Sequence, residues 1–427
     1  MRVLVLGLHY PPHHVGGYEV SCRDVAERLV DRGHDVTVLT SDLRRLGVAD
    51  PAGERTATVP VRRDLAAWFR DEQVYAPGLV TRWRRERRSQ RALRQALDDV
   101  RPDVVFVWQM GALSLGLITT IAARGVPIVY AIFDDWLSYA PKLDAWSRVV
   151  GRVPAPVARA AAAVLRVPTL VPDVGATGTL CFISEVTRRR AEEMSPSTLA
   201  DTTIVYCGID GRLFTPREDE PVPGRRKWRG RLLYVGRYDP RKGIETVVRA
   251  LLHLDEAVTL EVQGTGDPAE RDRLAAVAEA LGVGHRVRFQ TVSREELVER
   301  YRDADVFVFP SEWEEPFGLV PLEAMACATP VVATGVGGSG EFLLDEVNCL
   351  RFQAGDPLSL AAAVQRMAAD PELRADLVRR GLRTAAAFDV DRLTECFEAW
   401  LTGAASGFAH GRPSTRAVRF EDDDVRA

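Results

Sequence analysis

Two of the four glutamates in SEWEEPFGLVPLEAMACATPVVAT, residues 311–334, lie on opposite sides of a short turn. Glu315 comes just before the turn that Pro316 and Gly318 define, and Glu323 lies about one turn inside the helix expected to follow. Carboxylates accept hydrogen bonds from paired hydroxyls, which sugar and ribose rings present. The spacing predicts that both acids face one cleft. Amides at the helix start, available to hydroxyl or phosphate oxygens, belong to Phe317, Gly318, Leu319 and Val320.

A second group of residues has the chemistry of an anion site. The expected strand RLLYVG is followed by RYDPRKG, in which Gly236 permits a close turn and Arg237 and Lys242 precede a helix. A helix N-terminus attracts anions, and two cations beside it suit a diphosphate. Lys242 is one of three lysines in an arginine-rich chain, which favours a role for its compact charge. Gly264 and Gly266 end another expected strand, where a backbone can approach a ligand closely, although glycines are common there.

Each of these features also has an ordinary explanation when taken alone. Glu315 could be only a charge near a helix N-terminus, and Glu323 could lie on a solvated helix face. The RYDPRKG loop could be a solvated basic loop. The combination of two hydroxyl acceptors with an anion loop in one half of the chain favours a ligand that carries both a sugar and phosphate.

Apolar strands alternate with helical patterns along the chain, which predicts parallel sheets with crossover helices. The strand RVLVLGL, a loop and a helix after Gly16 and Gly17 begin the pattern, which DVTVLT, DVVFVW, PIVYAIF and GTLCFIS continue. It restarts after TPREDEPVPGRRKWRG with RLLYVGR, VTLEVQG, RVRFQ, DVFVFP and TPVVAT. We expect an α/β protein of two doubly wound domains, with the ligand in the cleft between them at the carboxyl ends of strands.

The expected domain boundaries follow from this restart. Residues 1–208 form the N-terminal domain and residues 209–385 the second domain. Residues 386–404 are expected to form a C-terminal helix that returns to the N-terminal domain. Residues 405–427 lack apolar periodicity and are expected to be a disordered tail.

Composition narrows the class of protein. The 427 residues are 46% hydrophobic and 27% charged, which is typical of a globular protein of two domains. A net charge of -4 argues against a general binder of nucleic acid. Six cysteines without a C-x-x-C pair, and an opening apolar run too short for a signal peptide, favour a cytoplasmic location. The uncharged run 104–123 is long enough to span a membrane, but it is better explained as a buried strand and a packed helix.

The segment EEPFGLVPLEAMACATPVVAT resembles the E-x7-E block of the retaining GT4-like glycosyltransferases. Further matches span most of the chain: GG at 16–17 with LVDRGHDVTVLT, CGID with Phe214, YVGRYDPRKGIETVVRAL, QGTGD, DVFVFPS and GVGGSGEFL. The resemblance implies the GT-B fold, two Rossmann-like domains facing a central cleft. It also implies a hexosyltransferase that moves a sugar, with retention, from a nucleoside-diphosphate sugar to a hydroxyl of a small-molecule, glycan or lipid acceptor.

The resemblance further implies residue roles on the donor. Arg237 and Lys242 would hold the diphosphate, and Glu323 would hold the nucleotide ribose. The transferred sugar would be held by Glu315 and by the amides of Phe317, Gly318 and Leu319.

Gly16 or Gly17 would approach the donor from the other domain. Such enzymes cancel leaving-group charge with side chains and helix ends, so no metal and no cofactor are expected. The leaving phosphate would help to deprotonate the acceptor on the same face, because no protein nucleophile is evident.

The acceptor side departs from the family pattern. Where the family often carries a histidine before an aspartate, this chain has Phe133 before Asp134 and Asp135. Either the alignment slips here, or His13 or His14 of the PPHHVGG loop compensates, or the chain has lost activity. Asp134 is kept as a candidate site residue, although it could be only a strand-end turn.

The acceptor itself is open. Residues 81–97, TRWRRERRSQRALRQAL, could lie on an anionic membrane that bears a lipid acceptor, or could form a solvated helix. A small-molecule acceptor is the alternative. Two other classes remain: a nucleotide-sugar epimerase, which the E-x7-E pattern fits poorly, and a catalytically inactive sugar-nucleotide-binding module, which Phe133 would suit.

Overall fold

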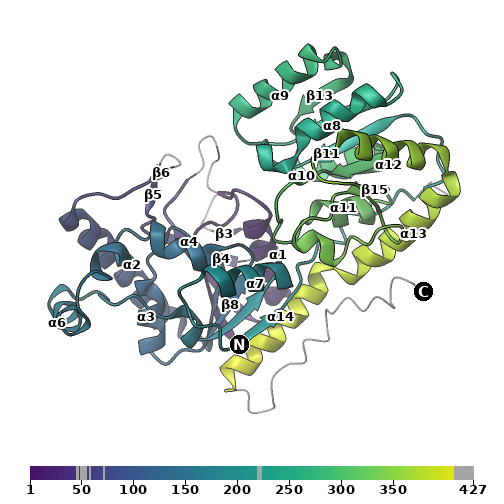
Figure 1. Ribbon diagram of the computed structural model, residues 1–427. Helices are drawn as coiled ribbons and strands as arrows, with labels where there is room; N and C mark the ends of the chain where they lie inside the picture. The colour runs from purple at the N-terminus through teal and green to yellow at the C-terminus, as the bar shows by residue number, and fades with distance from the viewer. Residues whose placement is uncertain (45–47, 49–54, 57–58, 71–72, 219–223, 408–427) are drawn as a thin grey trace. The chain divides into compact units, whose positions relative to one another are not determined.

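The computed structural model describes residues 1–44, 48, 55–56, 59–70, 73–218 and 224–407 (Figure 1). The described chain divides into two compact units, one of residues 1–206 with the helix after Asp391, and one of residues 207–390. The division falls between Tyr206 and Cys207. The tail expected over 405–427 lies outside the described residues from 408 onward.

Unit 1, residues 1–206 with the C-terminal helix, is built on an eight-stranded sheet with the order β10-β9-β8-β7-β1-β2-β4-β3. Every pairing is parallel except that of β3 with β4. The strands are β1 (Arg2–Gly7), β2 (Asp35–Ser41), β3 (Arg55–Thr56), β4 (Val59–Leu65), β7 (Val104–Val107), β8 (Ile128–Ile132), β9 (Thr179–Phe182) and β10 (Thr202–Ile204). A separate two-stranded pair consists of β5 (Phe69–Arg70) and β6 (Gln73–Val74).

The helices of unit 1 connect these strands. They are α1 (Gly17–Asp31), α2 (Leu79–Val100), α3 (Gly116–Ala123), α4 (Trp136–Leu143), α5 (Ser147–Val150), α6 (Ala155–Leu165) and α7 (Glu185–Met194), with a short turn η1 (Val174–Ala176). The apolar run 104–123 divides into β7, whose four residues are all buried, and α3. Within the described ranges, no helix is long and apolar enough to cross a membrane.

Unit 2, residues 207–390, has a six-stranded, fully parallel sheet with the order β13-β12-β11-β14-β15-β16. Its strands are β11 (Arg231–Val235), β12 (Thr259–Gln263), β13 (Val287–Gln290), β14 (Val306–Phe309), β15 (Val331–Ala333) and β16 (Leu350–Arg351). Its α-helices are α8 (Ile244–Ala250), α9 (Pro268–Ala280), α10 (Arg294–Asp303), α11 (Val320–Ala326), α12 (Pro357–Ala369) and α13 (Pro371–Ala387). Short helical turns are η2 (Pro240–Lys242), η3 (Leu251–His253), η4 (Gly284–Arg286) and η5 (Gly338–Glu341).

Local sequence explains where several of these helices start. Asp356 and Asp370 each accept hydrogen bonds from two backbone amides at the start of α12 and α13, and a proline follows each. Ser293 and Glu296 form a reciprocal capping box at α10. In both sheets the loops after parallel strands collect at the carboxyl edge, which is where the candidate residues must be sought.

The last helix, α14 (Val390–Ala405), belongs to unit 1 although it follows unit 2 in sequence. Its Phe397 is fully buried, with its ring centroid 4.8 Å from that of Phe106. Glu398 receives hydrogen bonds from Arg32 and His34 at 2.7 and 2.6 Å. Residues 386–387 belong to α13 rather than to this helix, because the chain bends between Ala387 and Val390.

Candidate active site

The centre of the candidate site in unit 2 is an ion pair between Lys242 and Glu315. Lys242 ends η2 after β11, and Glu315 lies in the loop after β14, the strand that pairs with β11. The Nζ atom of Lys242 is 2.5 Å from Oε1 of Glu315, and the Ser311 hydroxyl donates to the same oxygen at 2.9 Å. Glu315 is only 5% exposed. The fold therefore joins two residues that the sequence separates by 73 positions, at the carboxyl edge of the sheet.

The backbone around Glu315 is fixed by a crossing segment. The Gly338 amide donates to the Glu315 carbonyl at 2.7 Å, and Gly337 forms an isolated bridge with Glu315. Gly337 has a φ of +75°, and a Cβ there would lie 2.4 Å from the Glu315 nitrogen. Only glycine fits, because it tolerates this φ and has no side chain to clash.

The turn after Glu315 leads into α11 as expected. Phe317 is buried with its ring centroid 5.0 Å from Phe342 and 5.6 Å from Phe388, so it anchors the turn in the core. Gly318 has a φ of +95°, a value that glycine adopts readily. The half-buried amides at the helix start that donate to no acceptor among the described residues are those of Gly318, Leu319 and Val320.

Glu323 is the fourth residue of α11 and is held by a buried tyrosine. The Tyr301 hydroxyl donates to Glu323 Oε2 at 2.8 Å. Burial raises the pKa of the Tyr301 hydroxyl, and the Glu323 carboxylate raises it further, so Tyr301 stays a donor at neutral pH. Tyr301 therefore orients the carboxylate predicted to hold ribose.

The RYDPRKG loop contains one arginine that is paired with a carboxylate and two other cations that are candidates to bind phosphate. Arg241 donates to Asp239, whose pKa it lowers to about 2, and its guanidinium lies 4.6 Å from the centroid of the Trp313 ring. Arg237 is exposed, and its guanidinium pairs with no carboxylate in the part of the chain that the structure describes. An incoming anion could therefore meet Arg237 and Lys242 without breaking the pair between Arg241 and Asp239.

The strand-end glycines of unit 2 have a packing reason of their own. A Cβ at Gly264 would lie 2.1 Å from the Gly236 carbonyl oxygen, and the Gly236 amide donates to Gln263 at 3.0 Å. These two glycines therefore allow the ends of β11 and β12 to meet closely, whether or not a ligand is bound.

In unit 1, the predicted glycines lie at the start of α1. Gly16 is exposed and caps the helix, and its amide donates to Glu19 Oε2 at 3.0 Å. Gly17 is the first helical residue. A Cβ at Gly16 would have no described atom within 4 Å, so packing within unit 1 does not require glycine there.

Phe133 lies directly after β8 and is part of an aromatic cluster. Its ring is stacked on Tyr18 with centroids 5.3 Å apart, lies edge-on to Trp108 at 5.1 Å, and is 6.2 Å from Phe397 of α14. The side chain is 5% exposed. Phe133 therefore contributes to the core and offers no polar group to a substrate.

Asp134, the next residue, has a different environment. Its Oδ1 accepts from the Trp136 amide at 2.9 Å, which is the strand-end turn considered from the sequence. Its Oδ2 accepts from the Tyr139 hydroxyl at 2.7 Å, and that hydroxyl accepts from Gln109 at 2.8 Å. Burial raises the pKa of Asp134 to about 6, although these hydrogen bonds lower it. The structure thus places a carboxyl able to exchange a proton near neutral pH at the carboxyl edge of unit 1.

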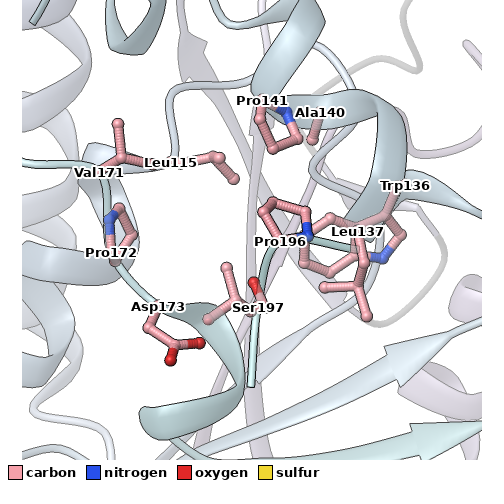
Figure 2. Close-up of a pocket in the computed structure, with 11 residues that line it drawn as sticks. Leu115, Trp136, Leu137, Ala140, Pro141, Val171, Pro172, Asp173, Pro196 and Ser197 are labelled. Carbon is pink, nitrogen blue, oxygen red and sulfur yellow. The ribbon is translucent and has the colours of Figure 1, made fainter. Parts of the chain in front are cut away.

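A cavity of about 230 Å³ lies behind this turn, with Trp136 and Leu137 facing Val171 and Pro172 across it (Figure 2). Its walls are mostly apolar, and the carboxylate of Asp173 beside it accepts from the amide and hydroxyl of Thr198. The cavity is below the range of about 300–1,000 Å³ usual for ligand sites. None of the predicted site residues lines it.

Sequence reasoning missed the residues that hold the predicted ones in place. Ser311 and Tyr301 donate to the two glutamates, and Gln109 and Tyr139 complete the chain to Asp134. Only Ser311 had a signal, because it follows a strand and precedes Glu315 by four positions. Among the described residues, no group of three or more His, Cys, Asp or Glu is placed to hold a metal ion.

Comparison with known proteins supplies the family. Residues 15–212 match the model of Glycosyltransferase Family 4, and residues 217–384 match that of Glycosyl transferases group 1. A D-inositol 3-phosphate glycosyltransferase of Xylanimonas cellulosilytica is 38% identical over 45% of this chain, a match that spans about half (49%) of the relative. A relative from Methanocaldococcus jannaschii, named an uncharacterized glycosyltransferase, is 29% identical over 87% of this chain and 90% of its own.

Solved structures agree on the fold. Sucrose-phosphate synthase of Thermosynechococcus elongatus superposes with a TM-score of 0.70 at 22% identity, covering 96% of this chain and 99% of that chain. HepE of Anabaena, solved with UDP and glucose, gives a TM-score of 0.67 at 20% identity over 94% of this chain and 100% of its own. At these identities the likeness concerns the fold alone. The two family models, which between them match residues 15–212 and 217–384, show that the chain belongs to the GT4-type glycosyltransferases. The superpositions show that its two Rossmann-like domains have the GT-B fold.

Proposed function

We propose that the chain transfers a sugar from a nucleoside-diphosphate sugar to an acceptor hydroxyl with retention of configuration. The observation that carries the proposal is the buried pair of Lys242 and Glu315 at the carboxyl edge of unit 2. A structural neighbour was solved with UDP and glucose, and another, a starch synthase of Arabidopsis thaliana, with ADP and acarbose. These neighbours support a nucleotide-linked donor but leave its base open.

In this proposal, charge neutralisation drives departure of the nucleoside diphosphate. Lys242 and Arg237 bind the diphosphate oxygens, and Glu323, oriented by Tyr301, accepts from the ribose hydroxyls. The amides at the start of α11 and the Glu315 carboxylate position the sugar. In this scheme Lys242, which pairs with Glu315, also binds the diphosphate, so it links the sugar and phosphate ends of the donor.

Retention requires that the acceptor attack from the face that the diphosphate leaves. The proposal assigns the acceptor proton to the leaving phosphate, which departs on the same face of the sugar. Asp134 of unit 1, with a pKa raised to about 6, is our candidate for contact with the acceptor. Metal and cofactor are not part of this scheme.

The location and the membrane also belong to the proposal. All six cysteines are thiols, and five of them are buried, which suits the cytoplasm expected from the sequence. The basic segment 81–97 is our candidate for a peripheral contact with a membrane, and the acceptor is a lipid, a glycan or a small molecule.

The test is product analysis with a panel of acceptors. Thermal shifts with UDP-, GDP-, ADP- and TDP-sugars first identify the donor, because a ligand that binds only the folded state raises its stability. Nuclear magnetic resonance then assigns the anomeric configuration of the product. An inverted product would refute retention. An isomerised donor formed without acceptor would identify an epimerase, and donor binding with no turnover on any acceptor would identify an inactive binding module.

A further inference from the structure

An apolar groove in unit 1 is not explained by donor or acceptor chemistry. It has a volume of about 360 Å³ and lies among the start of α2, α5 and α6. Its lining includes Leu79, Val80, Trp83, Trp146, Val150 and Leu165. The floor is a small hydrophobic cluster around Trp68 and Trp146, separate from the main core of the unit. The indole N–H groups of Trp83 and Trp146 donate to the carbonyls of Leu165 and Pro168, respectively. Because both N–H groups have partners, the groove surface is apolar.

The rim of the groove exposes large aliphatic side chains to solvent. Leu79 and Val80 at the start of α2 are 63% and 60% exposed, and Val157 and Val164 of α6 are 58% and 81% exposed. Such a concentration of exposed apolar side chains beside an apolar groove marks an interaction surface.

The charges around this groove have one sign. Between residues 145 and 172 the charged residues are Arg148, Arg152, Arg159 and Arg166, all exposed, and the segment has no acidic residue. Along α2, from residue 79 to 97, seven arginines accompany one acid, Glu86, which is fully buried. The chain as a whole has 60 acidic against 56 basic residues, so this surface differs sharply from the average.

Most of these arginines have no counter-ion on the protein. Arg88 pairs with Asp42, and Arg82 and Arg85 donate to backbone carbonyls. No carboxylate among the described residues pairs with the others that are exposed, which are Arg84, Arg91, Arg148, Arg152, Arg159 and Arg166. Unpaired guanidinium groups around an apolar groove are complementary to a surface that is anionic outside and apolar inside.

We propose that this groove and its arginine rim are a docking surface for a bilayer that contains acidic phospholipids. Leu79, Val80, Val157 and Val164 enter the boundary between head groups and acyl chains, and the arginines bind lipid phosphates. The contact thus centres on the start of α2 and on α6, rather than on the whole basic helix 81–97. The α2 residues that line the groove are Leu79, Val80 and Trp83, and no later residue of α2 lines it.

The position of the groove explains what docking would achieve. As a crossover helix between β4 and β7, α2 begins at the carboxyl edge of the sheet, and Arg82 donates to the Ala145 carbonyl in the segment after β8. Asp134 follows β8 at the same edge. If the proposed function is correct, docking would bring the acceptor side of unit 1 to the lipid head groups, where a lipid-borne hydroxyl is available.

The experiment measures co-sedimentation of the full chain with vesicles, without sugar nucleotide. Vesicles of phosphatidylglycerol and phosphatidylcholine are compared with vesicles of phosphatidylcholine alone, at low and high salt. The test variants are Val157→Asp/Val164→Asp, which removes the apolar contact, and Arg152→Glu/Arg159→Glu, which reverses the charge. The matched controls in unit 2 are Leu358→Asp, at a residue 62% exposed, and Arg383→Glu, at an exposed residue of α13. All substituted side chains are exposed, and unfolding temperatures check that each variant folds.

We expect the unmodified chain to bind the anionic vesicles and to be released by salt. Each test variant should lower the partition coefficient by at least about fivefold, the effect of roughly one membrane-bound charge, and both controls should bind normally. Brominated acyl chains should quench Trp83 and Trp146 only in chains that dock. Equal binding to neutral vesicles, or normal binding by the test variants, would overturn the proposal. So would a dimer in solution that Val157→Asp/Val164→Asp dissociates, since a second copy would then cover the groove. Vesicle binding by a chain without transferase activity would support docking while refuting the proposed function.

Discussion

At the residue scale, the pairing of Lys242 with Glu315 changes how a substitution at either position should be interpreted. Glu315 is buried, so a neutral residue at position 242 leaves a carboxylate without its cation, which is costly in the interior. Arg237 is exposed and can be removed without that cost. The two cations therefore need different controls, even though both are assigned to the diphosphate.

Removing either cation should weaken binding of the nucleoside diphosphate. Arg237→Ala and Lys242→Ala should each cost about 1.5 to 3 kcal/mol of binding free energy, as expected for hydrogen bonds to charged groups. Isothermal titration calorimetry measures the effect, and Arg383→Ala in α13 is the control. Lys242→Ala leaves the buried Glu315 carboxylate without a cation and so lowers stability as well as binding. The double variant Lys242→Met/Glu315→Gln removes both charges, so its loss of affinity can be measured without that loss of stability. Unchanged affinity in a folded Arg237→Ala/Lys242→Ala variant would refute the diphosphate site.

The two glutamates should respond differently to substitution. Glu323→Ala removes the proposed ribose contact, so affinity should fall for the free nucleoside diphosphate and for the sugar nucleotide alike. Glu315→Gln removes the anion opposite Lys242, so affinity for the free nucleoside diphosphate should not fall, whereas turnover should fall because the sugar is no longer positioned. Calorimetry with both ligands, together with a turnover assay, tests whether the two glutamates have these separate roles. An equal proportional loss for both ligands in both variants would contradict the separate roles.

Asp134 should make stability depend on pH. Its pKa is about 6 in the folded chain and near its ordinary value of 3.8 in the unfolded chain, so the folded state binds the proton more tightly. The resulting stabilisation is present below pH 3.8 and is lost as pH rises through about 6, up to about 3 kcal/mol in all. Asp134→Asn should flatten this part of the profile of unfolding temperature against pH, and Asp376→Asn, at an exposed residue of α13, should not. A profile identical to that of the unmodified chain would show that Asp134 does not titrate in this range.

At the element scale, hydrophobic pattern was enough to locate most of the strands of the two sheets, but it did not locate β3, β4, β10 and β16. Each expected strand, from RVLVLGL to TPVVAT, contains an observed one. Most of these strands are buried on both faces and have a continuous apolar run, whereas β13 (VRFQ) alternates between half-buried and exposed residues. The pattern failed for β4, whose sequence VPVRRDL carries three charges. Both of its valines and its leucine are buried, while the charged residues between them remain accessible. Alternating burial in a short, charged segment predicts a strand much less strongly than a continuous run of apolar residues does.

The sequence predicted several residues of the candidate site but not the contacts between them. Sequence marked Lys242 and Glu315 for separate reasons, but their contact depends on the pairing of β11 with β14, which are not consecutive strands. It could not reveal that Phe133 belongs to a core cluster, because the cluster includes Phe397 from the end of the chain. Nor could it identify Tyr301 as the partner of Glu323, since the two residues lie on different helices, α10 and α11.

The segment of Gly337 should be needed both for stability and for activity. Gly337→Ala combines an unfavourable φ of +75° with a Cβ only 2.4 Å from the Glu315 nitrogen. Gly282→Ala is a matched control, because Gly282 has a φ of +74° and open space around its Cα. The control should cost about 1 to 2 kcal/mol in unfolding free energy. Gly337→Ala should cost more and should also reduce turnover, because it displaces Glu315. Equal effects on stability and turnover in the two variants would show that the crossing segment does not position the site.

At the scale of the whole molecule, the two units supply different chemistry. Unit 2 holds the buried lysine, the two glutamates and the amides at the start of α11. Unit 1 holds the carboxyl of Asp134 and, on the same edge of its sheet, the apolar groove with its unpaired arginines. Because α14 returns to unit 1, both the first and the last described elements of the chain stabilise that unit. This division suits a donor bound by one unit and an acceptor brought by the other.

The last prediction concerns the metal, and it tests whether protein charges alone can stabilise the leaving group. If Lys242, Arg237 and the amides at the start of α11 neutralise the departing diphosphate, turnover should survive exhaustive treatment with EDTA. Initial rates before treatment, after treatment, and after adding Mg²⁺ or Mn²⁺ should agree within error. In Lys242→Met/Glu315→Gln, a divalent ion could replace part of the missing charge, so added metal should help this variant more than the unmodified chain. Loss of turnover in the EDTA-treated unmodified chain, with recovery on adding metal, would show that the protein charges are insufficient and that the proposed mechanism is wrong.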